Sequence, residues 1–331
     1  MAGLTAFRRI QIGKESTRGT PIAATKILLG KLEYTPTLDF YNPIDEERNS
    51  LAAHHRLSIV GQRADLKFDA AANYEQLIYF LAMALKGGIT ASTPGGGVNS
   101  RDWTFNPSLT AVNAQNAYTF EYGDDQQEYE SAFVMAKSLE FVYAMNAPVM
   151  LRADMFGYFP AKSTFTGALT VPTINDIISM KTKIYIDTTW AGLGTTQKTG
   201  ALVSGNVKFN TGLQMTKYGD GALDFSSFAE DKNFAEIELV MVHNAIGEAL
   251  YDDYAAQTLK FVRLITTGAI IEAALTYTLT VDLAIRITEP PKMFDTQDGE
   301  DVISFKGRTF NDPISGVQLQ VVVRNIETTL G

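Results

Sequence analysis

The sequence predicts a mainly β (α+β) protein made of two tandem β-sandwich or barrel modules, each with one short helix. Three observations support this prediction. Apolar and polar residues alternate with period two in many segments, the chain repeats its own order of elements, and two segments have helical spacing.

The predicted strands come from the alternation. It is clearest at residues 31–38, 65–68, 139–143 and 279–285, where every second residue is apolar. Such alternation is typical of strands with one buried face and one face in solvent.

Two segments are predicted to be short helices. Asn73 can cap the first, which carries Leu77, Ile78, Leu81 and Leu85 at helical spacing and ends at Gly87-Gly88. Asn244 precedes the second, which carries Ile246, Ala249, Leu250 and Tyr254.

The internal repeat begins as a block without gaps, in which residues 19–38 align with residues 194–213. Further along, the first helix cap aligns with the second. Near the end of each half, residues 139–145 align with residues 279–285. The order of elements is strand, strand, loop, strand, helix, strand, strand in both halves.

The repeat gives the predicted domain boundaries. Residues 1–160 form the first module, residues 161–182 a linker, and residues 183–331 the second module. An insertion at about residues 87–116, rich in Gly, Ser, Thr, Asn and Pro, is expected in the first module only.

Composition excludes several classes of protein. A net charge of −9 argues against a protein that grips nucleic acid, because phosphate binding needs clustered Lys and Arg. It leaves open a protein that nucleic acid passes without adhering. The chain has no cysteine, so disulfides and thiolate metal sites are excluded. We expect neither a signal peptide nor a membrane anchor.

No catalytic, cofactor-binding or metal site is expected, and the chain is predicted not to be an enzyme. Residues 122–125 (Tyr-Gly-Asp-Asp) imitate a polymerase metal hairpin, but a hairpin turn explains them. Residues 13–16 lack the earlier glycine of a phosphate-binding loop. Residues 295–301 lack the ligand spacing of an EF-hand, so a surface turn is predicted, with a weakly bound cation as the alternative.

Several motifs, taken in order, resemble the major tail tube proteins of siphophages, bacteriophages with long non-contractile tails. The resemblance is to the type with a duplicated tube domain and spans nearly the whole chain. Each motif is loose, and their order and spacing carry the resemblance. They are residues 12–15 with 19–21, 103–107 leading into 118–124, 136–141, 183–187 with 194–195, 202–205 and 210–213.

The resemblance implies a structural virion protein that stacks as rings into the tube through which phage DNA is ejected. In such proteins, sheets of neighbouring modules join into a β-barrel around a lumen, and the helix packs on the outer face of the sheet. Six modules per ring would come from three two-module chains, a pseudo-hexameric trimer. A ring of six chains is the alternative.

The same resemblance implies the location and the partners. The protein would assemble in the host bacterial cytoplasm and reside in the virion tail, with no membrane contact. Its partners would be other copies of itself, the tail tip, the tape measure and the terminator proteins. DNA would pass without sequence-specific binding, along a lumen that we expect to carry excess negative charge.

Stacked rings need projecting segments. Two long loops at equivalent places in the repeat, residues 39–56 and 214–232, are the predicted contacts, together with the N-terminal arm and the C-terminal tail. The contact candidates are Asn42, Asp45, Glu46, Glu47, Arg48, His54, His55, Tyr218, Asp220, Glu230, Asp231, Lys232, Arg8 and Arg9.

A second reading is a phage tail-tip or surface protein whose β-domains bind a carbohydrate or receptor. It would use exposed aromatic rings on one face, for which Trp103 and Trp190 are the available indoles.

Overall fold

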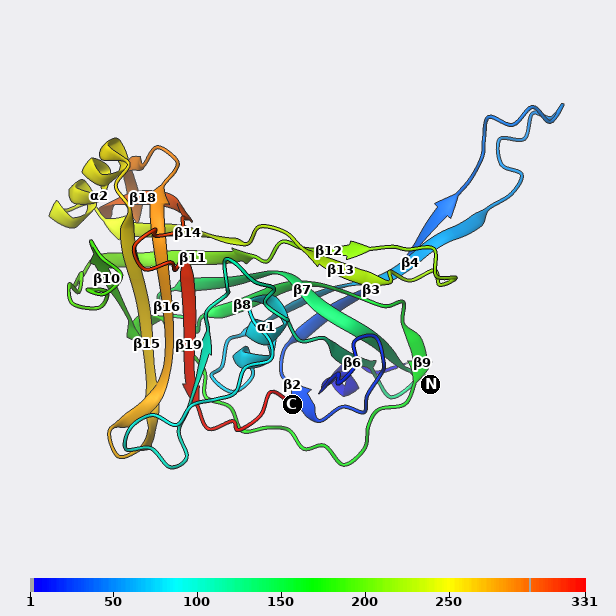
Figure 1. Cartoon of the computed structure of the whole chain (residues 1–331), viewed down its shortest axis with the longest axis horizontal. Helices are drawn as coiled ribbons and strands as arrows, with labels where there is room; N and C mark the ends of the chain where they lie inside the picture. Colours follow the sequence, from blue (N-terminus) through cyan, green and yellow to red (C-terminus); the bar gives the residue numbers. More distant parts are fainter. Residues whose placement is uncertain (1–2, 298) are drawn as a thin grey trace.

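The computed structural model describes residues 3–297 and 299–331, and the fold is mainly β with two α-helices, as predicted (Figure 1). Seventeen strands belong to one continuous antiparallel network, and two more form a separate hairpin. The two halves of the chain are therefore joined through their sheets.

The first half contains nine strands and the first helix. They are β1 (Arg9–Lys14), β2 (Lys26–Leu28), β3 (Lys31–Tyr41), β4 (Ser58–Ala71), α1 (Leu77–Ala84), β5 (Arg101–Phe105), β6 (Tyr118–Gly123), β7 (Glu128–Ala144), β8 (Met150–Gly157) and β9 (Ala161–Ser163). The long strand β7 takes part in two sheets. Its beginning pairs with β6, which in turn pairs with β1. Its end pairs with β8, β8 pairs with β4, and β4 pairs with β3.

The second half contains ten strands and the second helix. They are β10 (Thr182–Asp187), β11 (Leu202–Asn210), β12 (Leu213–Thr216), β13 (Ser227–Glu230), β14 (Phe234–Val242), α2 (Ala245–Ala256), β15 (Lys260–Glu272), β16 (Leu275–Ile287), β17 (Lys292–Gln297), β18 (Glu300–Thr309) and β19 (Leu319–Asn325). Short 3-10 helices lie at Thr5–Phe7 and Ser179–Lys181.

The pairing pattern of the first half recurs in the second. One sheet runs β10–β15–β16, like β1–β6–β7, and the other runs β11–β14–β18–β17, like β3–β4–β8–β7. Residues near Leu32 and near Val207 thus lie in corresponding strands, β3 and β11, each followed by its hairpin partner.

The end of the predicted alignment is wrong. Residues 138–142 pair with β8, whereas residues 278–283 pair with β15 and β19. Residues 285–287 at the end of β16, and then β17 after Pro290 and Pro291, pair with β18 as the end of β7 pairs with β8. Alternation alone cannot detect such a slip, because a strand looks the same after a shift of two residues.

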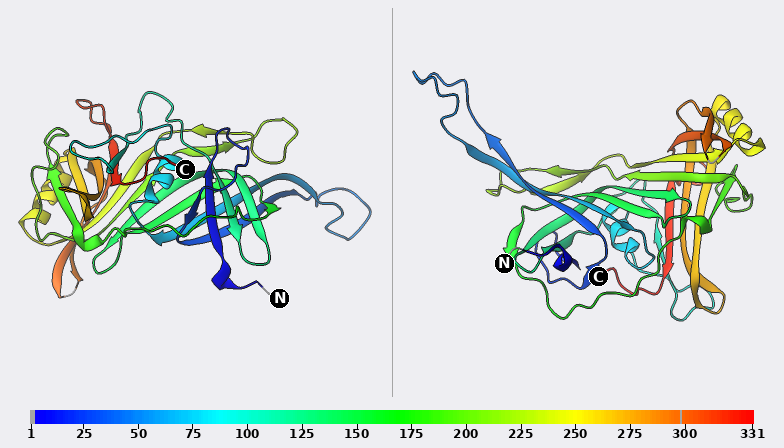
Figure 2. Two further views of the ribbon diagram at one scale, coloured as in Figure 1. Left: turned by 90° about the horizontal axis from the view of Figure 1, so that it is seen from below. Right: turned by 180° about the vertical axis from the view of Figure 1, so that it is seen from behind.

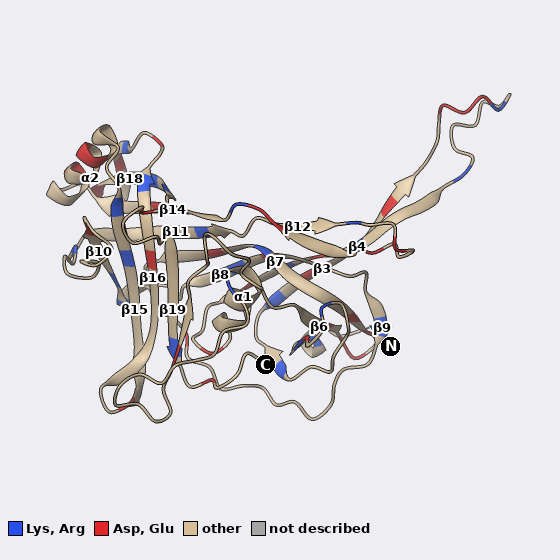
Figure 3. Cartoon of the chain, in the orientation of Figure 1, with Lys and Arg blue, Asp and Glu red and all other residues tan. Residues whose placement is uncertain are grey.

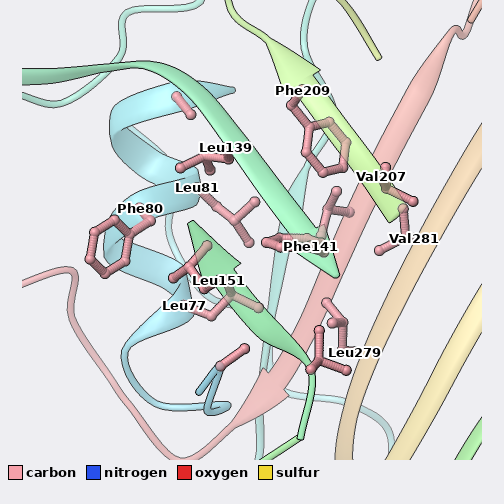
Figure 4. Close-up of a cluster of buried hydrophobic side chains, with 14 of the residues drawn as sticks. Leu77, Phe80, Leu81, Leu139, Phe141, Leu151, Val207, Phe209, Leu279 and Val281 are labelled. Carbon is pink, nitrogen blue, oxygen red and sulfur yellow. The ribbon is translucent and has the colours of Figure 1, made fainter. Parts of the chain in front are cut away.

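One hydrophobic core serves both halves. It contains Leu81 of α1, Phe141 of β7, Phe209 of β11 and Leu279 of β16, all fully buried (Figure 4). Phe141 and Phe209 meet edge to face, with ring centroids 5.3 Å apart. The two modules are therefore packed into one body.

The two helices are buried to different degrees. All eight residues of α1 are buried, which agrees with its uniformly apolar sequence. The insertion covers it, since Asn116 N–H donates to the Ala82 carbonyl and Gly87 N–H to the Asn113 carbonyl. In α2 only Gly247 and Leu250 are buried, and the predicted Asn244 cap accepts from Ile246 N–H at 2.9 Å.

The insertion and the C-terminal tail tie the halves together. Within the insertion, β5 pairs with β19, and β19 pairs on its other edge with β16. Near the end of the chain, Tyr118 Oη donates to the Leu330 carbonyl at 2.7 Å. The predicted linker also lies against the first half: β9 pairs with β7, and Asn175 N–H donates to Glu75 at 2.9 Å.

Candidate assembly interface

The two repeats meet edge to edge inside the chain. Residues 204–210 of β11 pair in antiparallel register with residues 138–144 of β7, with Val207 opposite Phe141. This joint makes one eight-stranded sheet in the order β3–β4–β8–β7–β11–β14–β18–β17.

The two edge strands of this sheet, β3 and β17, each have one unpaired side in the described part of the chain. Among the described residues, β3 has an antiparallel register only with β4, and β17 only with β18. In the repeat, β3 corresponds to β11 and β17 to the end of β7, which are the two strands that pair at the internal joint. An open edge offers unpaired backbone N–H and C=O groups to another strand. The two edge strands, β3 and β17, therefore correspond to the two strands of the internal joint, and they could form the same joint between two chains.

The first predicted contact loop is a projecting arm. The strands β3 and β4 extend beyond the body of the molecule, and residues 42–57 form the tip (Figures 1 and 2). The predicted candidates Asn42, Asp45, Glu46, Glu47, Arg48, His54 and His55 all lie there. His54 Nδ1 lies 2.7 Å from Asn42 Nδ2, and Arg56 is paired with Glu46.

The arm carries apolar side chains that are exposed to solvent in the part of the chain that the structure describes. Seven of them are exposed: Phe40, Tyr41, Ile44, Leu51, Leu57, Ile59 and Val60. Sequence reasoning selected the charged residues of this loop and missed these. The sequence of the loop did contain evidence for them, because apolar residues on a segment with no intramolecular partner indicate a contact surface.

The second predicted contact loop, residues 214–232, is a hairpin instead of an irregular loop. The strands β12 and β13 pair with Leu213 opposite Glu230, and the tip holds Tyr218 and Asp220. This hairpin lies along the base of the arm, where Lys217 Nζ contacts Asp39 at 2.9 Å. The arm and the β12–β13 hairpin project from the sheet on the side toward which β3 and β4 extend into the arm (Figure 1).

Not every candidate of the second loop faces outward. Glu230 accepts hydrogen bonds from Asn113 N–H at 3.1 Å and Gln115 Nε2 at 3.1 Å, so it anchors the insertion. Asp231 and Lys232 are exposed.

The N-terminal candidates lie next to the open edge of β3. Arg8 and Arg9 are exposed, and the Arg9 guanidinium lies 4.6 Å from the ring centroid of Phe165. A cavity of about 690 Å³ separates this segment from β2 and the start of β3.

One face of the eight-stranded sheet packs on the core and the other carries charge. Along the polar face, directly opposed residues form a row whose charge alternates in sign over seven strands. In strand order the row is Lys31, Asp69, Arg152, Glu140, Lys208, Glu236 and Arg308, and Arg286 at the end of β16 lies opposite Arg308. Basic and acidic residues are likewise interspersed along these strands in Figure 3.

Three carboxyl groups lie buried beside the N-terminal strand. Glu15 accepts from Phe133 N–H at 2.7 Å and Gly19 N–H at 2.7 Å, and Glu121 accepts from Thr166 N–H at 2.8 Å. Glu128 differs, because neither of its buried oxygens has a hydrogen-bond partner among the described residues. Burial, with the nearby charges of Glu121 and Glu130, raises the pKa of Glu128 to about 7.

The remaining motifs have structural roles. A hairpin turn was predicted at residues 122–125; Tyr122 and Gly123 end β6, and the turn lies at residues 124–127, where Asp124 accepts from Gln126 N–H at 2.9 Å. Residues 295–301 join β17 to β18, and Asp298 lies outside the described residues. No group of three or more potential metal ligands occurs within residues 3–297 and 299–331. Trp103 is buried, and Trp190 is half-buried against Phe261, so the two indoles do not form an exposed aromatic surface for a sugar.

The comparisons with known proteins give no family: no protein-family model matches the sequence, and no curated protein matches it. In the part of the chain that the structure describes, no helix has the length and apolar character needed to cross a membrane.

Proposed function

We propose that the protein is the major tail tube subunit of a siphophage, which closes into rings and stacks into the tube that conducts phage DNA. The observation that carries the proposal is the internal joint between β7 and β11, together with the open edges of β3 and β17. A chain whose two ends reproduce its own internal joint associates head to tail, and such contacts either close into a ring or grow into a filament.

Strand number favours three chains per ring. Eight strands per chain would give about 24 strands in a trimer, and at ordinary strand spacing and tilt this cylinder is about 40–50 Å across between backbones. That leaves room for a DNA duplex after side chains line the wall. Six chains would give roughly twice that width.

The arm and the second hairpin support stacking. Both leave the same end of the sheet, and the exposed apolar residues of the arm need cover from another molecule. A neighbouring ring would supply it.

Electron microscopy of the purified chain tests the proposal. We expect tubes or stacked rings with threefold chain symmetry. Compact particles that never form rings would reject it, and rings of six chains would reject the trimer.

Cross-linking tests the edges directly, because the chain has no cysteine of its own. Lys292→Cys on β17 is combined in turn with Lys31→Cys, Glu33→Cys and Thr35→Cys on β3. At least one combination should form disulfides between chains, giving a ladder that ends at three. Lys183→Cys, exposed on the other sheet, is the control partner and should link with none of the three.

A further inference from the structure

The polar face of the eight-stranded sheet is charged but balanced. The row that crosses seven strands alternates in sign, and the rows beside it contribute Glu33, Lys67, Asp154, Glu238 and Lys306. With Arg286, which lies opposite Arg308, these rows hold seven basic and six acidic side chains. They therefore contribute none of the excess negative charge in the chain's net charge of −9.

Ion pairs hold several of these charges together. Arg308 contacts Glu236 at 2.6 Å, Arg152 contacts Glu140 at 3.6 Å and Lys306 contacts Glu238 at 3.6 Å. Exposed pairs of this kind add little stability. They do cancel each other's field at short range, so a polyanion near this face meets no cluster of free bases.

The opposite face of the same sheet bears a second layer. The sheets β1–β6–β7 and β10–β15–β16, with buried α1, lie on that side, around the core. When a sheet closes into a cylinder, the convex side has more room than the concave side. The thicker layer must then lie outside, which leaves the polar face inside.

We infer that this polar face lines the lumen and presents DNA with a wall of interspersed, largely paired charges and no excess of negative charge. The inference rests on the proposed function and replaces the expectation of an excess of negative charge there. DNA slides because Lys31, Arg152, Lys306 and Arg308 each contact a neighbouring acid, and the other bases of the wall lie among acidic side chains. Removing acids should turn the wall into a DNA-binding surface.

The test uses tubes of the full chain, short duplex DNA and a nuclease. In the lumen variant, Glu140→Gln, Glu236→Gln and Glu238→Gln are combined, which frees three bases per chain, Arg152, Arg308 and Lys306. Wild-type tubes should protect little DNA, and the variant should protect at least tenfold more at 50 mM salt. For three phosphate contacts, protection should fall roughly 40-fold between 50 and 200 mM salt.

A matched control removes the same charge elsewhere. Asp176→Asn, Glu248→Gln and Asp252→Asn lie on exposed positions of the linker and α2. Control tubes should behave as the wild type does. If they protect as much DNA as the lumen variant, or if the lumen variant protects none, the inference is overturned. Failure of wild-type chains to form tubes would instead reject the proposed function.

A second measurement does not depend on the triple variant folding. Asp154→Cys on the polar face and Asp252→Cys on α2 are single exposed substitutions in a chain without cysteine. In assembled tubes, a small maleimide should label both sites, and a maleimide on a bulky polymer should label position 154 at least tenfold more slowly. Equal rates at the two sites would place the polar face outside the tube.

Discussion

Replacing Glu128 with glutamine should stabilise the protein at alkaline pH and have no effect near pH 4.5. The Glu128 carboxyl is 3% exposed, lacks hydrogen-bond partners among the described residues and lies near Glu121 and Glu130. Its pKa is therefore raised from 4.5 to about 7. The folded state prefers the protonated carboxyl, which glutamine imitates in shape and neutrality.

The sign follows from proton linkage. Below pH 4.5 the Glu128 carboxyl is protonated in both the folded and the unfolded state, so it does not lower the free energy of unfolding. Between pH 4.5 and 7 the unfolded chain ionises first, so the free energy of unfolding falls with rising pH. Each pKa unit corresponds to about 1.4 kcal/mol, so the loss above pH 7 is at most about 3 kcal/mol.

Urea denaturation of wild type and Glu128→Gln at pH 5 and pH 8 measures this effect. The variant should gain up to about 3 kcal/mol at pH 8 and less than about 1 kcal/mol at pH 5. Glu33→Gln, on an exposed glutamate paired with Lys31, is the control and should change little at either pH. An equal gain at both pH values, or a loss at pH 8, would refute the account of Glu128.

Three further substitutions test contacts between strands, two of which join the halves of the chain. Phe141→Ala removes a fully buried ring that packs on Phe209 at the internal joint, and should lower the free energy of unfolding by about 3–5 kcal/mol in chemical denaturation. Arg263→Met leaves Asp282, which is 1% exposed, without its partner 2.7 Å away, and should lower the free energy of unfolding by about 3–5 kcal/mol. A variant that unfolds at the same urea concentration as the wild type would contradict this pairing. Glu272→Ala removes the acceptor for the backbone N–H groups of residues 98–100. These hydrogen bonds lower the pKa of Glu272 to about 2. Without them, limited proteolysis should cut the insertion near residues 98–100 faster than in the wild type.

The sequence predicted the mainly β class, the two helices and the repeated order of elements. These features are local: period-two alternation marks a strand wherever it pairs, and Asn244 caps α2 through its own neighbours' N–H groups. The projecting segments were also predictable, because long stretches without a regular pattern separate strands at equivalent places in the repeat.

The tertiary structure alone decided how the strands pair and which residues stay free. Alternation carries no information about register, so it could not show that residues 285–287 of β16 together with β17 are the counterpart of the end of β7. It also could not show that Glu230 turns inward to hold Asn113, or that β5 joins β19 across the chain. Such contacts link residues distant in sequence, and only the shared core and the paired backbones bring them together.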